Sequence, residues 1–129
     1  MWAAAEPAAV RLIRPPAGYS DVRLLGAMLI RDGPSWRPAG VLAHLVNGAL
    51  FGVVFSRLGG RGWKQGLAAA EAENMVLWPA MAVVDRLHPD RRSGAWPRLL
   101  TDGRVFAYEA AVHAVFGVVL GALARSPRR

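Results

Sequence analysis

Cysteine is absent from this 129-residue chain, which excludes disulfides, cysteine-ligated metal sites and thiol catalysis. Lysine is almost absent as well, because Lys64 is the single lysine among 16 basic residues. The arginines are spread along the chain, without the compact basic cluster and interleaved aromatic residues of a nucleic-acid groove. We therefore expect no nucleic-acid partner.

Recognisable catalytic motifs are lacking too. No serine has a histidine and an acid at the spacing of a known triad, and the chain has no glycine-rich phosphate loop. This favours a non-enzymatic role but leaves an enzyme open.

Long stretches of the sequence contain no charged residue, and these uncharged stretches predict the fold. Residues 38–56 and 110–124 contain no charged side chain, and helical segments are expected at about 39–58, 63–87 and 104–124. Each is about as long as a membrane-spanning helix needs to be. The middle segment is the least apolar, because Glu71, Glu73 and Asn74 lie inside it, and Pro79 predicts a kink. We expect an all-α protein with a three-helix transmembrane bundle.

The flanking regions complete the predicted domain organisation. Residues 1–20 predict a flexible N-terminal arm, and we expect no secretory leader because Glu6 and Pro7 interrupt the first apolar run. Residues 21–31 predict a short interfacial helix with Ser20 as its N-cap. Residues 21–125 then form a single helical membrane domain, and residues 126–129 form a basic tail.

The few polar residues of the third segment indicate a lipid environment. Between residues 105 and 124 the strongly polar side chains are Glu109 and His113, with Tyr108 beside them. A helix on the surface of a soluble protein repeats polar residues every three or four positions on its outer face. Here they gather on one face and the opposite face is apolar, which favours lipid. The alternative is a soluble helical bundle that buries the same residues around a ligand.

A sequence echo links the first and third segments. "VLAHLVNGALFG" (41–52) and "AAVHAVFGVVLG" (110–121) both contain His-x-x-x-Gly-x-x-x-Gly, which indicates a degenerate duplication. Small residues four apart let membrane helices approach closely. We expect these glycines to pack the two helices together, and their faces suggest a homo-oligomer or a subunit of a larger membrane complex. The glycines are Gly48, Gly52, Gly117 and Gly121.

Each segment carries one polar stripe when it is drawn as a helix. If the three polar stripes face the centre of the bundle, six polar residues lie at about the same height along it. Glu73 falls on the opposite face of the middle helix. The predicted cluster consists of His44, Asn47, Glu71, Asn74, Glu109 and His113.

Four interpretations of this cluster stay open, and the least favoured is haem held by His44 and His113, because a close Gly-x-x-x-Gly contact leaves little room for it. The other three are as follows. The first is structural, with neutral histidines hydrogen-bonded to pin the helix packing. The second is a divalent metal site of zinc, iron or manganese. Its ligands would be His44, Glu71, Glu109 and His113. The third is proton handling by a Glu109–His113 pair, which lie four residues apart and can touch.

Charge asymmetry predicts the orientation. The side that holds the N-terminus and the loop at 88–103 carries ten arginines, against six basic residues on the other side, which places the N-terminus in the cytoplasm. The combination "HLVNGALFG … DRLHPD … HAVFGVVLG" resembles small uncharacterised bacterial polytopic membrane proteins over roughly residues 30–125. This resemblance implies the bacterial cytoplasmic membrane and transfers no activity. The sequence therefore favours a structural or accessory membrane protein, with a metal- or proton-binding enzyme or transporter as the alternative.

Overall fold

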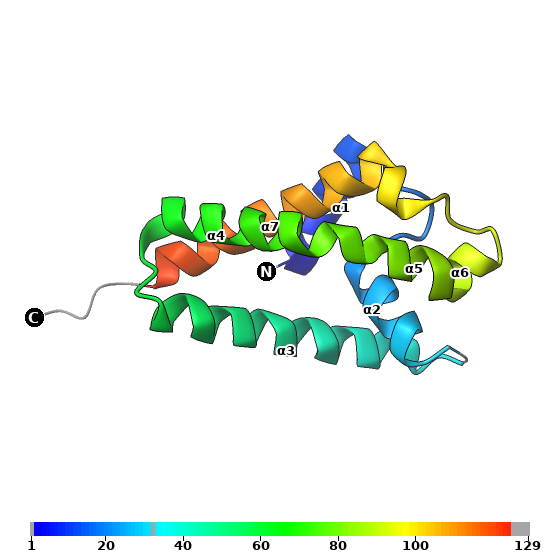
Figure 1. The fold of residues 1–129 in the computed structure, drawn as a ribbon, viewed down its shortest axis with the longest axis horizontal. Coiled ribbons are helices and arrows are strands. Elements are labelled where there is room, and N and C mark those ends of the chain that lie inside the picture. The colour runs from blue at the N-terminus through cyan, green and yellow to red at the C-terminus, as the bar shows by residue number, and fades with distance from the viewer. Residues whose placement is uncertain (1, 32, 125–129) are drawn as a thin grey trace, which may run out of the picture.

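Helices make up all the regular structure in the described part of the chain. The computed structural model describes residues 2–31 and 33–124 (Figure 1). The predicted basic tail at 126–129 lies outside these residues. The elements in chain order are α1 (Trp2–Ile13), α2 (Asp21–Leu29), α3 (Trp36–Arg57), α4 (Gly62–Leu77), the 3-10 turn η1 (Trp78–Ala80), α5 (Met81–Leu87), α6 (Pro89–Arg92), the 3-10 turn η2 (Leu99–Thr101) and α7 (Gly103–Leu123).

Three helical stretches are long and apolar enough to cross a membrane, as the sequence predicted. They are Trp36–Arg57, Gly62–Leu87 and Gly103–Leu123, with mean hydropathies of 1.7, 1.2 and 1.7. Only 11%, 17% and 33% of their most apolar windows are buried within the chain. Large apolar side chains such as Leu45 and Val76 therefore face outward. An apolar exterior suits lipid, so the chain is an all-α membrane protein with a bundle of three spanning helices.

α4 and α7 form the tightest helix pair, and glycine makes their close contact possible. A methyl group added at Gly117 would lie 2.7 Å from the Cβ of Ala70, and one added at Gly66 would lie 2.9 Å from the Cα of Gly121. Figure 1 shows the two helices side by side, with α3 running apart from them. A side chain at these positions would push the helices apart, so the glycines set their separation.

This arrangement differs from the predicted contact between the two helices that share the repeat. Gly117 and Gly121 of α7 face α4, not α3. A methyl group at Gly48 would stand 3.6 Å from the Phe116 ring, and one at Gly52 would stand 3.6 Å from Leu120. These are ordinary contacts. The large side chains of α7 keep α3 at a distance, so the repeat glycines do not bring α3 and α7 together.

α3 is instead held by α2, the short helix that precedes it. Ser20 caps α2 as predicted, because its Oγ accepts a hydrogen bond from the Arg23 N–H at 3.2 Å. Gly26 of α2 meets Gly40 of α3, where a methyl group on Gly40 would lie 3.1 Å from the Gly26 Cα. This close crossing turns the start of α2 into the bundle, where Asp21 and Leu24 are buried.

The predicted flexible arm at residues 1–20 contains a helix in the structure. α1 packs on α7 and ends at Ile13. Arg14 then takes a left-handed φ of 52°, and two prolines follow it. A residue before proline avoids the helical region, which explains why the helix stops there. The alanine-rich composition before that point favours a helix and outweighs the single proline inside it.

Pro79 interrupts the second span as predicted. The backbone changes there from α-helix to the 3-10 turn η1 before α5 continues. Proline has no N–H to donate and clashes with the preceding turn, so the helix tightens locally. The kink swings α5 toward α2 and α7 at one end of the bundle.

That end of the bundle holds the main aromatic core. Tyr19, Trp96 and Tyr108 pack together, with ring centroids 5.0 Å apart for Tyr19–Trp96 and 5.6 Å apart for Tyr19–Tyr108. His88 is fully buried and stacks on Trp96 at 4.4 Å. The core fixes the position of Tyr19, which matters for the site described below.

Two aspartates of the "DRLHPD" stretch hold this end of the bundle together through hydrogen bonds and an ion pair. Asp85 accepts hydrogen bonds from the backbone N–H groups of Leu99 and Leu100, at 2.7 and 3.1 Å. Asp90 forms a two-pronged ion pair with Arg23, at 2.7 and 2.8 Å. The Arg23 guanidinium lowers the pKa of the Asp90 carboxyl, so this pair ties α2 to the loop after α5.

Candidate functional site

A cavity of about 240 Å³, which we name the polar cavity, lies where α2, α3, α7 and the kinked second span meet. Five of the six predicted cluster residues line it: His44, Asn47, Asn74, Glu109 and His113. Glu71 does not line it. Asp21, which the sequence analysis did not single out, does. The structure therefore brings five of the six predicted residues to one cavity and adds a carboxyl group that was not predicted.

Glu109 is buried within the first turns of α7 and is 6% exposed. The Tyr19 hydroxyl donates a hydrogen bond to its Oε1 at 2.5 Å. Burial, followed by the nearby Glu109 charge, raises the pKa of Tyr19 well above its ordinary value, so Tyr19 keeps its proton and stays a donor. The aromatic core therefore supplies Glu109 with one fixed partner.

Asp21 faces the same space without such a partner. It is 4% exposed, and neither carboxyl oxygen has a hydrogen-bond partner within the part of the chain that the structure describes. Burial, and then the charge of Glu109, raises the pKa of Asp21 well above the ordinary value, while His44 and His113 lower it by less. Asp21 therefore holds a proton under conditions in which an exposed aspartate is ionised.

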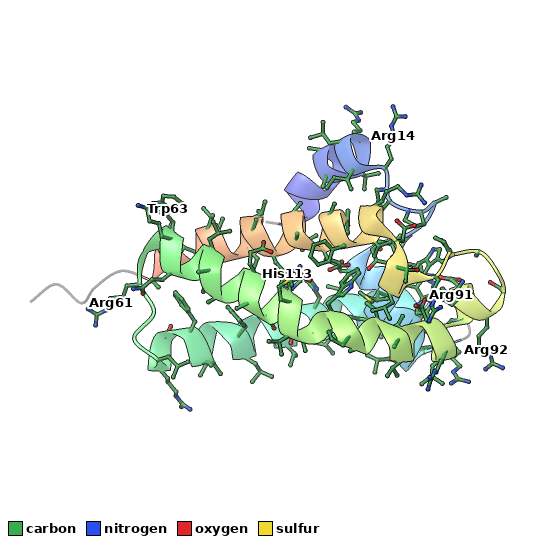
Figure 2. All side chains as sticks on the ribbon, turned by 45° about the horizontal axis from the view of Figure 1, so that its top comes forward. Arg14, Arg61, Trp63, Arg91, Arg92 and His113 are labelled. Carbon is green, nitrogen blue, oxygen red and sulfur yellow. The ribbon has the colours of Figure 1, made fainter. Side chains whose placement is uncertain are left out.

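His113 makes a different contact from the predicted pairing of its side chain with the Glu109 carboxylate. Its Nδ1 lies 2.8 Å from the backbone carbonyl oxygen of Glu109. A carbonyl only accepts, so Nδ1 carries the proton, and in the neutral ring Nε2 is the acceptor. Figure 2 shows His113 near the middle of the bundle. The Glu109 carboxylate turns toward Tyr19 instead, because that hydroxyl is held beside it.

Asn74 contributes a second buried group that lacks a partner. It lies four residues after Ala70 on the face of α4 that packs against α7, and it is 3% exposed. Its Nδ2 donates no hydrogen bond among the described residues. A buried amide without a partner costs about 1–3 kcal/mol. The polar cavity therefore combines an unpaired donor with an unpaired carboxyl group.

A second cavity of about 380 Å³, the histidine cavity, adjoins the first and shares His44, Asn47 and His113 with it. Glu73 lines this cavity. The sequence analysis put Glu73 on the opposite face and chose Glu71 for the cluster. The structure reverses these roles because Gly66, not the polar stripe, sets which face of α4 meets α7.

The predicted metal ligands do not form a ligand set. Among the described residues, no group of three or more histidine, aspartate and glutamate side chains is placed to hold a metal ion. Glu71 is absent from the lining of the polar cavity, and the Glu109 carboxylate is bonded to Tyr19. The divalent metal site predicted from His44, Glu71, Glu109 and His113 is therefore not supported by the geometry.

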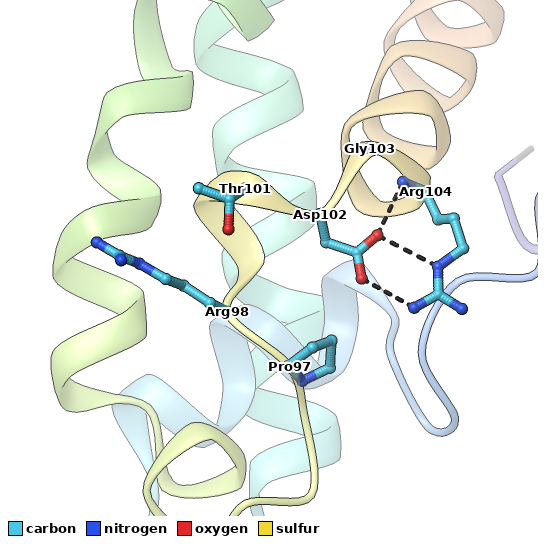
Figure 3. A pocket seen from close by; sticks show the side chains of 6 residues that line it. All are labelled: Pro97, Arg98, Thr101, Asp102, Gly103 and Arg104. Atoms are coloured by element: carbon cyan, nitrogen blue, oxygen red, sulfur yellow. Dashed lines mark hydrogen bonds and ion pairs between the residues drawn. The ribbon is translucent and has the colours of Figure 1, made fainter.

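Another hollow lies at the start of α7, where Asp102 and Arg104 are paired with each other (Figure 3). Asp102 caps the helix by accepting from the Arg104 backbone N–H at 2.8 Å, and it also binds the Arg104 guanidinium at 3.0 Å. The Arg104 hydrogen bond lowers the pKa of Asp102. These contacts are those of a helix N-cap, so this hollow is structural.

Comparisons with known proteins give no further guide to the site. No family model matches the chain, and neither a curated protein nor a solved structure matches it.

Proposed function

We propose that this chain is a small, non-enzymatic membrane protein that binds and releases a proton in its polar cavity. The observation that supports the proposal is the buried Asp21 carboxyl, which lies against Glu109 and whose two oxygens have no geometric hydrogen-bond partner among the described residues. Two carboxyl groups that share a low-dielectric site cannot both ionise easily. One of them must carry a proton or meet a positive charge.

Several titratable groups lie close enough to Asp21 to exchange a proton with it. Tyr19 is hydrogen-bonded to Glu109, and His44 and His113 line the same cavity as Asp21 and Glu109. Histidine changes charge near neutral pH, and ionisable groups inside membrane segments are characteristic of proton-handling sites. Asn47 is exposed and also lines the cavity, which places the cluster within reach of the surface.

Infrared spectroscopy of the purified protein in lipid nanodiscs tests this proposal. A protonated carboxyl group absorbs separately from a carboxylate, so we expect a protonated band at neutral pH that decreases as the pH rises. Asp21→Asn should remove that change, and the amide mimics a protonated carboxyl in shape. Asp102→Asn is the matched control, because Asp102 is ionised and paired with Arg104 outside the cavity.

Absence of a protonated carboxyl at neutral pH would overturn the proposal. The cluster would then be structural, and the accessory role that the sequence favours would stand in its place.

We also propose the bacterial cytoplasmic membrane as the location, with a cytoplasmic N-terminus. The ten-to-six bias in basic residues supports this orientation. Figure 2 shows Arg91 and Arg92 at one end of the bundle and Arg61 at the other. The absence of native cysteine makes the test simple. Ser93→Cys should react with an impermeant thiol reagent only after cells are opened, and Lys64→Cys should react in intact cells; the reverse pattern contradicts the orientation.

Self-association stays a proposal on weaker ground. The glycines that suggested it are used within the chain, since Gly117 and Gly121 pack on α4. The mass of the protein in lipid nanodiscs, measured by light scattering, decides between a monomer and an oligomer.

A further inference from the structure

Three cavities that share lining residues follow one another between α3 and the α4–α7 pair, and together we name them the groove. The polar cavity and the histidine cavity share His44, Asn47 and His113. The histidine cavity in turn shares Glu73 with a third cavity of about 520 Å³, which we name the apolar cavity. The walls of the groove therefore continue from α2 at one end of the bundle to the loop between α3 and α4 at the other.

The distance between α3 and α7 keeps this groove from closing. α3 is anchored by α2 through Gly26 and Gly40, near its own start. Farther along, Phe51 of α3 meets Phe116 of α7 edge to face, with ring centroids 5.6 Å apart. These two rings hold α3 and α7 apart. The glycines of α4 and α7, in contrast, allow those two helices to pack closely.

The groove changes from acidic and polar to apolar along its length. Asp21 and Glu109 line the polar cavity, and Glu73 lies at the junction of the other two. The apolar cavity is walled mainly by Phe51, Phe55 and neighbouring aliphatic side chains. Within the described part of the chain, none of the residues that line the three cavities is a lysine or an arginine. This acidic lining contrasts with the net charge of +7 for the whole chain.

We propose that the groove binds an amphiphile with a primary ammonium head and a single alkyl tail, a ligand class that rests on the proton site proposed above. The head lies in the polar cavity, where the Asp21 carboxyl is more than nine-tenths buried and its two oxygens have no hydrogen-bond partner among the described residues. An ammonium group has three N–H donors and no acceptor, so it suits carboxylate and imidazole acceptors. The tail extends along the apolar cavity.

Other features of the groove agree with this choice of ligand. Trp78 lines the polar cavity, and an indole ring attracts a cation that lies over its face. A phospholipid with an amine head also carries a phosphate, which would lie among carboxyl groups with no lysine or arginine in the groove lining to balance it. The free amine is therefore favoured over the lipid. A metal ion is disfavoured because no three-ligand group exists among the described residues.

Binding of the amine and loss of the proton are coupled in this arrangement. The ammonium stabilises ionised Asp21, so uptake of one amine displaces the proton from the carboxyl group into solution. Tyr19, His44, Glu109 and His113 face Asp21 from the other elements, and Glu73 stands farther along the groove. Proton and amine thus compete for one site.

Calorimetry of the full-length protein in phosphatidylcholine nanodiscs tests the proposal, with dodecylamine as the probe. Titration in two buffers of different ionisation enthalpy reports the number of protons released per amine. We expect saturable binding with about one proton released, and binding to Asp21→Asn weakened by about tenfold or more. Dodecanol and dodecanoate have the same tail without the cation and should bind far more weakly.

A second variant separates the groove from the proton site. Gly48 lies beside Phe116 in the histidine cavity, so Gly48→Leu should fill the path of the tail. We expect it to lose amine binding while the infrared titration of Asp21 stays as in the wild type. Asp102→Asn, outside the groove, should bind the amine normally.

Equal binding of dodecanol and dodecylamine would overturn the amine proposal and leave the proton site intact. Amine binding without proton release would overturn the proton site. Displacement of dodecylamine by nanodiscs that contain phosphatidylethanolamine would overturn the assignment to a free amine in favour of a lipid.

Discussion

At the scale of single residues, the chemistry of the site depends on which carboxyl groups have partners. Glu109 has the Tyr19 hydroxyl, and Asp90 has Arg23. Asp21 has no hydrogen-bond partner among the described residues, and it is more deeply buried than Asp90. The pKa values of these two aspartates therefore shift in opposite directions. Arg23 lowers the pKa of Asp90, and burial raises the pKa of Asp21.

The raised pKa of Asp21 predicts how stability depends on pH. A group whose pKa is raised in the folded state contributes stability below its ordinary value, 3.8 for aspartate, and loses it as pH rises through the folded value. We expect the free energy of unfolding in detergent to fall from acidic toward alkaline pH, by about 1.4 kcal/mol for each unit of the shift that is crossed.

Asp21→Asn should flatten this alkaline loss, which chemical unfolding monitored by circular dichroism at a series of pH values can measure. Asp90 has a lowered pKa, so its contribution is lost instead as pH falls, and Asp90→Asn should change only the acidic side. An alkaline loss that persists in Asp21→Asn would show that another group controls it.

At the scale of helices, glycine and phenylalanine decide which pairs pack closely. α4 and α7 touch through Gly66, Gly117 and Gly121, whereas Phe116 stands between α3 and α7. The two halves of the sequence repeat therefore have different structural roles. In α7 the repeat glycines make a close helix contact, whereas in α3 Gly48 lines the histidine cavity and Gly52 lies beside Leu120.

Identical substitutions in the two repeats should differ in cost. Gly117→Ala places a methyl group 2.7 Å from the Ala70 Cβ and against the Gly66 backbone, so we expect a loss of about 1–3 kcal/mol of stability. Gly48→Ala places its methyl group 3.6 Å from Phe116 and gains helix propensity, so we expect a change within about 0.5 kcal/mol.

Unfolding of both variants in mixed micelles of increasing sodium dodecyl sulfate measures the difference. Equal costs for the two substitutions would contradict the α4–α7 contact as the closer one.

At the scale of the whole molecule, the exterior is more apolar than a water-soluble bundle tolerates. Most of the apolar window in each spanning helix is not buried within the chain, and large side chains such as Leu42 and Leu50 face outward along α3. Such a surface lowers its free energy by contact with lipid tails. The polar cavity lies inside the bundle. Polar side chains are therefore inside and apolar side chains outside, the reverse of their distribution in a soluble protein.

Alkaline carbonate extraction of membranes checks this arrangement. We expect a tagged form of the protein to stay in the membrane pellet and to dissolve only in detergent, because three apolar helices cannot be exposed to water at modest cost. A peripheral membrane protein extracted in parallel is the control. Release of the tagged protein with the peripheral control would place the same helices in a soluble bundle.

The sequence by itself determined the class of the fold and the general place of the site. Three uncharged or nearly uncharged runs predict three spanning helices, because length and apolarity are local properties that any bilayer imposes. Helical periodicity likewise placed His44, Asn74 and His113 on the inward faces of their helices, and these faces meet in the polar cavity. Local geometry was sufficient for both results.

Only the tertiary structure decided which partners these faces meet. Asp21 gave no signal in the sequence, because an acidic residue in the first turn of a helix normally faces solvent, and only the Gly26–Gly40 crossing turns it into the bundle. Likewise, the glycines of α4 and α7 rotate α4 so that Glu73, not Glu71, faces the groove. Helix rotation and crossing depend on contacts between segments distant in sequence, and no single helical pattern contains that information.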